Sequence, residues 1–169
     1  ATAPGAGPVD DTVVTRPLSS DETATARGLA PHPDQASLVA TVDESLLAAR
    51  LFPGAVALGV FADETLVGFM MGQPLGDAED GFLVWDFFID RNHQGRGIGE
   101  AAVRGALAYA ASIGCRSVKL AYAPENLAAR SLYRKLGFVE TGRRDRDEQD
   151  RPLPRVLMRP QAEIVTRPA

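Results

Sequence analysis

The chain has 169 residues, of which 45% are hydrophobic and 24% are charged, and its 18 basic and 22 acidic residues give a net charge of −4. This composition is typical of one globular domain. It excludes a disulfide scaffold, because Cys115 is the single cysteine. It also excludes a transmembrane helix, since no apolar run approaches about 18 residues. The acidic balance argues against a nucleic-acid partner, which usually requires a basic face.

The two ends of the chain differ in composition from the rest. We expect one domain over residues 12–160, preceded by a tail at residues 1–11 that is rich in Ala, Pro and Gly, and followed by a second tail at residues 161–169. The first residues lack the charged start and the continuous apolar stretch of a secretory signal. We therefore expect a cytoplasmic protein with no membrane partner.

Capping residues and prolines divide the first half of the chain into short elements. A strand, three short helices and two further strands are expected at residues 13–15, 19–29, 34–40, 43–50, 55–61 and 66–71. Asp34 is predicted to cap the second helix. Asp63-Glu64 is predicted to form the turn of a β-hairpin between the last two strands.

The second half of the chain alternates strands and helices around its most apolar segment. Strands are expected at 82–89, 118–122, 138–143 and 155–159, and helices at 97–113 and 127–136. Residues 82–89 are apolar almost without interruption, which is typical of a central strand. The polar segment Asp145–Pro154 is predicted to be a mobile loop. The order of elements predicts a mixed sheet flanked by helices, in the α/β (α+β) class.

A glycine-rich segment, Gln94-Gly95-Arg96-Gly97-Ile98-Gly99, lies between the best strand and a helix. Glycines allow close approach of the backbone to a ligand, and the first turn of a helix attracts pyrophosphate. Three interpretations are open: a dinucleotide fingerprint, a turn without ligand, and a coenzyme A loop. The first requires an acidic residue about 20 positions further on, and none occurs between Ala101 and Pro124.

A second block follows after a predicted helix and a predicted strand: Asn126-Leu-Ala-Ala-Arg-Ser-Leu-Tyr133-Arg-Lys-Leu-Gly-Phe138. Together the two blocks resemble the signatures of the GNAT N-acetyltransferase superfamily. The resemblance implies a mostly antiparallel sheet of about six to seven strands with about four helices, and acetyl-CoA as co-substrate. Within the superfamily, Trp85-Asp-Phe-Phe-Ile-Asp90 and Pro124-Glu125-Asn126 resemble bacterial polyamine acetyltransferases, although Asp86 stands where those proteins often carry arginine.

The resemblance also implies roles for particular residues. The backbone of Phe87, Phe88 and Ile89 would hydrogen-bond the pantetheine arm and the thioester carbonyl, which stabilises the oxyanion as it forms. Asn126 would bind near the thiol end. Tyr133 would contact the cofactor and act as general acid, because its phenol is neutral at pH 7. The pyrophosphate would be held by a loop made of Gln94, Gly95, Arg96, Gly97, Ile98, Gly99 and Glu100.

An alkylammonium must lose a proton before it can attack, so a base is also expected. Asp86 is the first candidate because it is a charge within the most apolar strand. Glu125 is an alternative, whereas Tyr122 is poorly suited to the role at neutral pH. Asp43 and Glu44 would either anchor a second ammonium or cap a helix.

The remaining reactive side chains give weaker signals. His32 and His93 lack metal-ligand spacing, so no metal is expected, and His93 is expected to be solvated. Cys115 is expected to be a buried thiol. Arg91 and Arg96 would either contact phosphates or lie in solvent.

The leading functional hypothesis is acetylation of a polyamine or diamine. The alternatives are an antibiotic, an amino acid or a protein N-terminus as acceptor, and a non-catalytic CoA-binding regulatory module. A homodimer is among the expected assemblies.

Overall fold

The computed structural model describes residues 12–76, 81–146, 149 and 151–160. The two predicted tails lie outside these residues. The chain forms one seven-stranded sheet with the order β1-β2-β3-β4-β5-β7-β6. The strands are β1 (Val13–Pro17), β2 (Val56–Ala62), β3 (Thr65–Pro74), β4 (Gly81–Ile89), β5 (Ser117–Tyr122), β6 (Phe138–Arg146) and β7 (Pro152–Pro160). The helices are α1 (Ser20–Ala26), η1 (Pro33–Gln35, a 3₁₀ turn), α2 (Val42–Ala49), α3 (Ile98–Ser112) and α4 (Leu127–Lys135).

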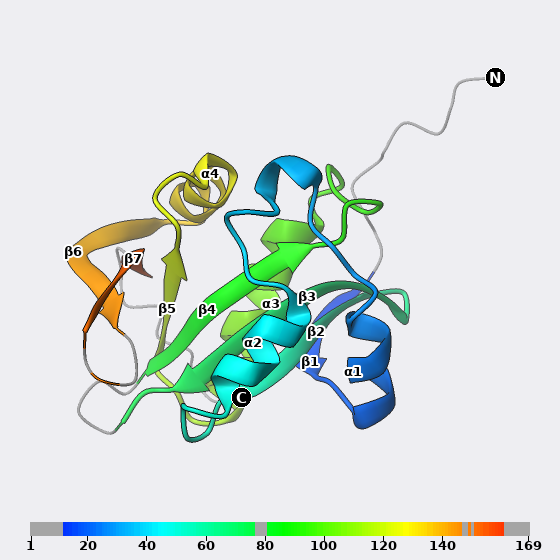
Figure 1. The fold of residues 1–169 in the computed structure, drawn as a ribbon, viewed down its shortest axis with the longest axis horizontal. Coiled ribbons are helices and arrows are strands. Elements are labelled where there is room, and N and C mark those ends of the chain that lie inside the picture. The colour runs from blue at the N-terminus through cyan, green and yellow to red at the C-terminus, as the bar shows by residue number, and fades with distance from the viewer. Residues whose placement is uncertain (1–11, 77–80, 147–148, 150, 161–169) are drawn as a thin grey trace.

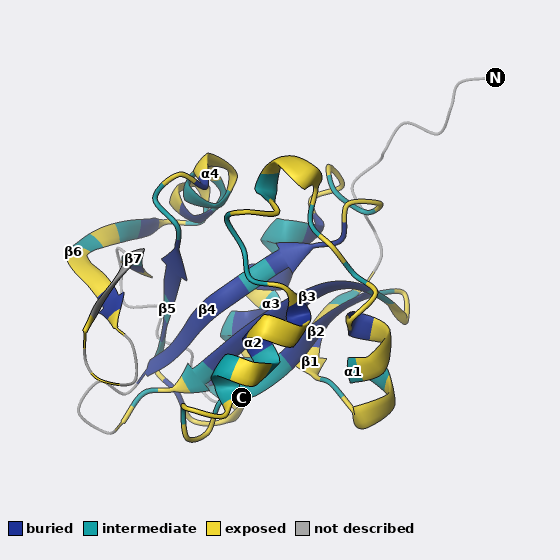
Figure 2. Ribbon diagram, viewed as in Figure 1, coloured by how far each residue is buried: buried dark blue, intermediate teal, exposed yellow. Residues whose placement is uncertain are grey.

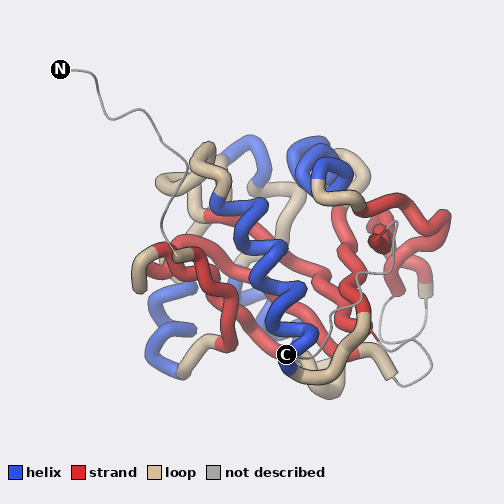
Figure 3. The backbone as a smooth tube through the Cα atoms, turned by 180° about the vertical axis from the view of Figure 1, so that it is seen from behind, coloured by secondary structure: helices blue, strands red, loops and turns tan. Residues whose placement is uncertain are grey.

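Helices cover both faces of the sheet (Figures 1 and 3). On one face, α1 and α2 contribute Ala26 and Val42 to a buried cluster with Phe69 and Trp85 of the sheet. On the other face, α3 packs against β1, β4 and β5, and α4 lies beside β5 and β6. Figure 2 shows that the central strands are buried along most of their length, as two-sided coverage requires.

Strand β4 occupies the centre and pairs with β3 in the antiparallel sense and with β5 in the parallel sense. The parallel pairing runs from Gly81–Ser117 to Val84–Leu120 and ends there. On its other edge β5 pairs with β7, from Leu120–Met158 to Tyr122–Val156. Among the described residues, the second half of β4 therefore has no strand partner on its β5 side, and Figure 1 shows the two strands diverging. This opening exposes backbone hydrogen-bonding groups at the centre of the fold.

A β-bulge lies where the opening begins. Met71 of β3 faces Asp86, whereas Gly72 faces Val84, so Trp85 is an extra residue in β4. Val84 and Phe87 consequently pack on the α3 side, while Trp85 and Phe88 pack on the α2 side. A regular strand would place residues three apart on opposite faces. The bulge thus changes which side chains of β4 face each helix layer.

The sequence predicted this fold class and nearly every element, including the positive-φ turn at Asp63 and Glu64. The predicted helix over 34–40 was wrong. The chain there forms only the 3₁₀ turn Pro33–Gln35, and its N-cap is His32, whose Nδ1 accepts from the N–H of Asp34.

Strands β6 and β7 extend into the segment that was predicted to be a loop, since Arg146 pairs with Pro152 and Asp145 is buried. Residues 147, 148 and 150 of that loop lie outside the described part of the chain.

Helix α3 approaches β1 closely at one position. A Cβ atom at Gly105 would lie 2.6 Å from Oγ1 of Thr15 and 3.2 Å from its backbone nitrogen. The Thr15 hydroxyl donates to the carbonyl of Ala102, at 3.0 Å. Glycine is therefore required for this packing distance. Within the described residues, no helix is long and apolar enough to cross a bilayer.

Candidate active site

The turn between β4 and α3 is held by side-chain hydrogen bonds to the backbone. Nε2 of Gln94 donates to the carbonyl of Ile89, at 2.8 Å. The carboxylate of Asp90 accepts from the backbone N–H groups of Ala30 and Asn92, at 3.0 and 3.3 Å. Burial alone would raise the pKa of Asp90, but these bonds and a contact with His93 outweigh it and lower the pKa. Asp90 therefore remains ionised and fixes the turn.

Two glycines shape the start of α3. Gly95 has a φ of +80° and Gly97, the N-cap residue, has a φ of +74°. No heavy atom lies within 4 Å of a Cβ placed at either position, so the requirement for glycine is conformational rather than steric. No side chain caps the helix. Its first N–H groups and the positive end of its dipole consequently remain available to a phosphate.

The glutamate in the first turn of α3 is neutralised by two cations. Glu100 bonds Arg104 on the same helix and Lys135 at the end of α4, each at 3.0 Å. Hydrogen bonds from these two side chains lower the pKa of Glu100. Because the pairs offset its negative charge, Glu100 does not exclude an anion from the helix start.

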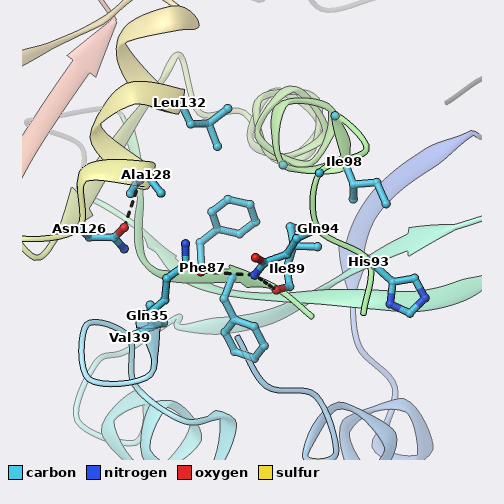
Figure 4. A pocket seen from close by; sticks show the side chains of 15 residues that line it. Gln35, Val39, Phe87, Ile89, His93, Gln94, Ile98, Asn126, Ala128 and Leu132 are labelled. Carbon is cyan, nitrogen blue, oxygen red and sulfur yellow. Dashed lines mark hydrogen bonds between the residues drawn. The ribbon is translucent and has the colours of Figure 1, made fainter. Parts of the chain in front are cut away.

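A cavity of about 240 Å³ lies between this turn, β4 and α4 (Figure 4). It brings together most of the residues predicted to bind the cofactor: Phe87, Phe88, Ile89, Gln94, Gly95, Gly97, Ile98, Gly99 and Asn126. Arg96, Glu100 and Tyr133, which were also predicted to contact the cofactor, do not line it, and Arg96 is exposed. The elements therefore converge as the two sequence blocks predicted.

Sequence reasoning missed part of the cavity wall. Gln35 and Val39 reach it from the segment around the 3₁₀ turn, and Ala128 and Leu132 reach it from α4. Gln94 bridges the two sides, because its Nε2 also lies 3.3 Å from Oε1 of Gln35. No local pattern marked residues 35–39, since only the tertiary fold brings them to β4.

Asn126 connects the cavity to α4. It is buried and caps the helix, and its Oδ1 accepts from the N–H of Ala129 at 3.1 Å. Its side chain also lines a second, smaller pocket of about 20 Å³ that shares Val39, Phe87 and Ala129 with the first. The small pocket is therefore the inner end of the same site.

The two predicted catalytic side chains, Tyr133 and Asp86, both line the small pocket. Tyr133 is buried and packs edge-on against Tyr122, with ring centroids 5.8 Å apart. Burial raises the pKa of Tyr133, and the negative charge of Asp86 raises it further. The phenol is thus held in its protonated, proton-donating form.

Asp86 lies at the bulge and is buried. Its Oδ2 accepts a 2.8 Å hydrogen bond from the hydroxyl of Ser45, a buried residue of α2. Ser45 was missed by sequence reasoning. A signal was present, because Ser45 lies three residues after Val42 and four before Ala49 on the apolar side of the helix.

The alternative candidates for a base have other surroundings. Tyr122 donates to Oε1 of Glu140 at 3.4 Å, and burial raises its pKa. Glu125 is exposed and does not line either pocket. Of these residues and Asp86, only Asp86 is a carboxylate in the small pocket.

The two acidic residues at the start of α2 have structural partners. Glu44 completes a capping box with Thr41, and Asp43 pairs with Arg27 at 2.8 Å. The helix-capping interpretation is confirmed for Glu44. Neither residue lines the pockets around Tyr133.

Of the two histidines, His93 lines the cavity at the glycine-rich turn. His93 is partly buried and lies 3.3 Å from Asp90, so the expectation of a solvated side chain was wrong. In the described part of the chain, no group of three or more His, Cys, Asp or Glu residues could hold a metal ion. Cys115 is buried in the core, as predicted.

Comparison with known proteins identifies the family of the chain. Residues 21–138, more than half of the chain, match the family model described as "Acetyltransferase (GNAT) family". The chain belongs to the GNAT acetyltransferase family. This confirms the resemblance carried by the two sequence blocks, and it agrees with the predicted N-acetyltransferase and its co-substrate acetyl-CoA.

Curated relatives match over part of their length. A probable spermine N(1)-acetyltransferase from Bacillus subtilis subsp. natto is 30% identical over 52% of this chain and 62% of its own. Human N-acetyltransferase 8B is 33% identical over 48% of this chain and 37% of its own. The chain therefore spans less than two thirds of the length of either relative.

Solved structures confirm the GNAT fold. Spermidine N-acetyltransferase from Vibrio cholerae, crystallised with CoA and spermine, gives a TM-score of 0.62 at 20% identity over 87% of this chain and 92% of its own. The ribosomal-protein-S18-alanine N-acetyltransferase of Escherichia coli gives 0.63 at 18% identity, over 88% and 93%. Another structure of the Vibrio cholerae enzyme, with a TM-score of 0.60 at 19% identity over 87% of this chain and 91% of its own, is described as dodecameric.

Proposed function

We propose that this protein transfers the acetyl group of acetyl-CoA to a primary amine of a small molecule, with Tyr133 as general acid. One observation carries the proposal. The opening between β4 and β5, the uncapped start of α3 and the buried phenol of Tyr133 border one continuous site. These are the parts that acyl transfer from a pyrophosphate-bearing thioester requires.

The residues fit acetyl-CoA as a substrate. Backbone N–H groups from Gly97 to Glu100 would hold the pyrophosphate, because that helix start has no side-chain cap. The edge of β4 at Phe87–Ile89 has no strand partner on the β5 side among the described residues, and apart from the Ile89 carbonyl, which Gln94 occupies, it would bond the pantetheine amides and the thioester oxygen, in the way that a further strand pairs with a sheet edge. A backbone N–H directed at that oxygen stabilises the developing negative charge.

The chemical steps then follow from the positions of Tyr133 and Asp86. The neutral amine attacks the thioester carbon and forms a C–N bond, and the C–S bond breaks as the tetrahedral intermediate collapses. Tyr133 donates its proton to the leaving thiolate sulfur, which gives CoA. The proton lost by the amine passes to Asp86 or to water, and a proton from solvent restores the phenol of Tyr133.

Polyamines and diamines are the acceptors that the names of the relatives indicate. The charge of the site supports polyamine and diamine acceptors less strongly than the names of the relatives do. An acidic acceptor pocket would favour a polycation, and the described lining of the small pocket supplies one carboxylate, Asp86. We therefore keep the acceptor as a primary amine and treat its further chemistry separately below.

Release of CoA from acetyl-CoA, followed across spermine, spermidine, putrescine, an aminoglycoside, amino acids and a short peptide, tests the proposal. Turnover with at least one amine class is expected, with the acetylated amine identified by mass spectrometry. Binding of acetyl-CoA without acetylation of any amine would overturn it in favour of a non-catalytic CoA-binding module. A reaction without amine serves as control for direct thioester hydrolysis.

A homo-oligomer is proposed as the assembly, on the strength of the sequence expectation and the dodecameric neighbour. Light scattering on the purified protein tests it. A mass of 18.0 kDa, that of one chain, would overturn it.

A further inference from the structure

A second cavity, of about 500 Å³, lies on the α2 side of the sheet against β6 and β7. It is larger than the cavity at the glycine-rich turn. Leu83 and Leu157 form part of its apolar surface, together with Phe52 from the segment after α2. Neither sequence block that identified the acetyl-CoA site predicted this cavity.

The lining of this cavity is basic. Among the described residues it carries five cationic side chains and one carboxylate: Lys119, Arg143, Arg144, Arg146, Arg159 and Asp145. The whole chain has the opposite balance, with a net charge of −4. A concave surface with a local excess of positive charge concentrates anions. The described part of the lining, in which Arg143, Arg144, Arg146 and Arg159 are exposed, therefore favours a negatively charged ligand group.

A polar group in the wall supports the same conclusion. The side chain of Gln73 lines the cavity, and its Oε1 is buried without a hydrogen-bond partner among the described residues. Buried polar atoms are nearly always paired in folded proteins. A bound molecule that carries amide N–H groups as well as an anion would satisfy it.

The basic cavity and the reaction centre lie on the same strands. Leu83 lines the cavity and Asp86 lines the small pocket. Because of the bulge at Trp85, these two residues face Gln73 and Met71 of β3, which lie two residues, or about 7 Å, apart along that strand. Leu157 of the cavity pairs directly with Ala121 of the small pocket. The rings of Phe52 and Trp85, one from each lining, contact each other with centroids 5.6 Å apart. One extended molecule could therefore reach both.

We propose that the acceptor is an amine that also carries a carboxylate, and that the basic cavity binds this carboxylate. The inference rests on the proposed acetyl transfer and names its acceptor class. The amine lies at Asp86 and Tyr133, and the carboxylate lies among Arg143, Arg159 and their neighbours. The site is thus acidic at one end and basic at the other, which complements a short peptide better than a polyamine.

Matched acceptors test the charge requirement. Triglycine, an extended tripeptide with an amine at one end and a carboxylate at the other, is compared with triglycinamide, which lacks only the carboxylate charge, and with spermidine. The kcat/KM for triglycine is expected to exceed that for either of the others by tenfold or more. Equal rates for triglycine and triglycinamide, or a preference for spermidine, would overturn the inference while leaving the proposed acetyl transfer intact.

Substitutions in the basic cavity test whether the carboxylate of the acceptor binds there. Arg143→Gln combined with Arg159→Gln is expected to raise the KM for triglycine tenfold or more, with kcat and the kinetics for triglycinamide unchanged. Arg27→Gln, which removes an exposed cation whose partner is Asp43, is the matched control and is expected to change neither. A double variant that behaves like the wild type with triglycine would overturn the assignment of the cavity.

A binding measurement separates failure of this inference from failure of the proposed function. Trp85 is the single tryptophan and contacts Phe52 of the cavity, so its fluorescence is titrated with triglycine in the absence of acetyl-CoA. Saturable binding that the double variant loses supports the anion site even if no amine is acetylated, an outcome that would overturn the transferase. Absence of carboxylate-dependent binding, with acetylation of other amines, would overturn the anion site alone.

Discussion

The hydroxyl of Ser45 in α2 donates a 2.8 Å hydrogen bond to the carboxylate of Asp86 in β4, and both side chains are buried. The bond connects the helix layer on one side of the sheet to the bulge at which β4 and β5 separate. A buried carboxylate requires such a donor. The pair therefore fixes the position of a negative charge at the inner end of the site.

Replacing Asp86 with Asn tests its role in proton transfer. The amide oxygen still accepts from Ser45, so the fold is expected to persist, whereas the charge that assists deprotonation of the amine is lost. We expect kcat to fall by about 10²-fold, the lower range for a general base. Steady-state assays with the best acceptor measure this. Asp43→Asn, which changes a surface ion pair, is the control, and an unchanged kcat in Asp86→Asn would remove Asp86 from the mechanism.

Replacing Tyr133 with Phe removes the proposed proton donor and keeps the buried ring. We expect kcat to fall by about 10²- to 10⁴-fold, with little change in the KM for acetyl-CoA. Tyr109→Phe is the matched control, because Tyr109 also packs against a core aromatic, Phe82, but lies outside the site. Comparable losses in both variants would indicate a structural role for Tyr133.

The pH profile gives a separate test of Tyr133. Burial and the charge of Asp86 both raise its pKa above the usual value of 10. The phenol therefore stays protonated throughout the range from pH 7 to about 9.5. We expect the rate to rise with pH over this range as the amine loses its proton. A falling limb near pH 8 to 9 that disappears in Tyr133→Phe would contradict the raised pKa.

Gly97→Ala tests the start of α3. A positive φ costs a non-glycine residue about 1–2 kcal/mol, and relaxation of the turn would misdirect the N–H groups that hold the pyrophosphate. We expect the KM for acetyl-CoA to rise at least about tenfold, equivalent to about 1.4 kcal/mol. Gly114→Ala is the control, because Gly114 also has a positive φ and open space, and lies after the end of the same helix. Its KM should stay at the wild-type value, and a rise in both variants would mean that only stability was affected.

The ion pair between Arg16 and Glu22 predicts a dependence of stability on pH. The hydrogen bond from Arg16, together with that from the Ser19 backbone, lowers the pKa of Glu22 from 4.5 to about 2. Because the folded pKa lies below the unfolded one, the stabilisation is complete above about pH 4.5 and is lost as the pH falls to about 2. The difference in unfolding free energy between the wild type and Glu22→Gln should shrink over this interval. A difference that is constant from pH 6 to pH 2 would contradict the assignment.

Gly105→Ala tests the close packing of α3 against β1. The added methyl group would lie 2.6 Å from Oγ1 of Thr15 and 3.2 Å from its backbone nitrogen, so the helix must move. We expect a loss of about 1–3 kcal/mol in unfolding free energy, as is usual for overpacking. Denaturant titration measures it. Gly28→Ala, where the nearest contact would be 3.4 Å, is the control and should be close to neutral.

The elements that the sequence predicted well have strong local signals. The apolar run of β4 and the glycine-rich turn into α3 are both readable without tertiary information. The rotation of α3 about its axis has no such signal. Ile98, Ala102, Val103, Ala106 and Ala110 are buried, and Gly105 packs against Thr15 of β1. The nearly uniform small residues of α3 leave its rotation to be set by packing against Thr15.

The parts of the site that sequence reasoning missed depend on long-range contacts. Ser45 reaches Asp86 across 41 residues, and Gln35 reaches Gln94 across 59. The change of facing along β4 is caused by the bulge at Trp85, which no alternation of apolar residues signalled. The basic cavity was missed because Lys119, Arg143 and Arg159 lie on three different strands, which only the pairing of β5, β6 and β7 brings together. Arg146 was assigned to a predicted loop, whereas β6 continues through it.

The parallel ladder between β4 and β5 also has a mechanical consequence. Four residue pairs, from Gly81–Ser117 to Val84–Leu120, join the two strands at one end. Because the ladder joins the two strands at one end only, a small rotation there would change the width of the opening at the other end. A long substrate whose amides bond to β4 while its head group lies at α3 and α4 would hold the opening at a fixed width. Substrate binding would thereby complete the rigidity of the sheet at its centre.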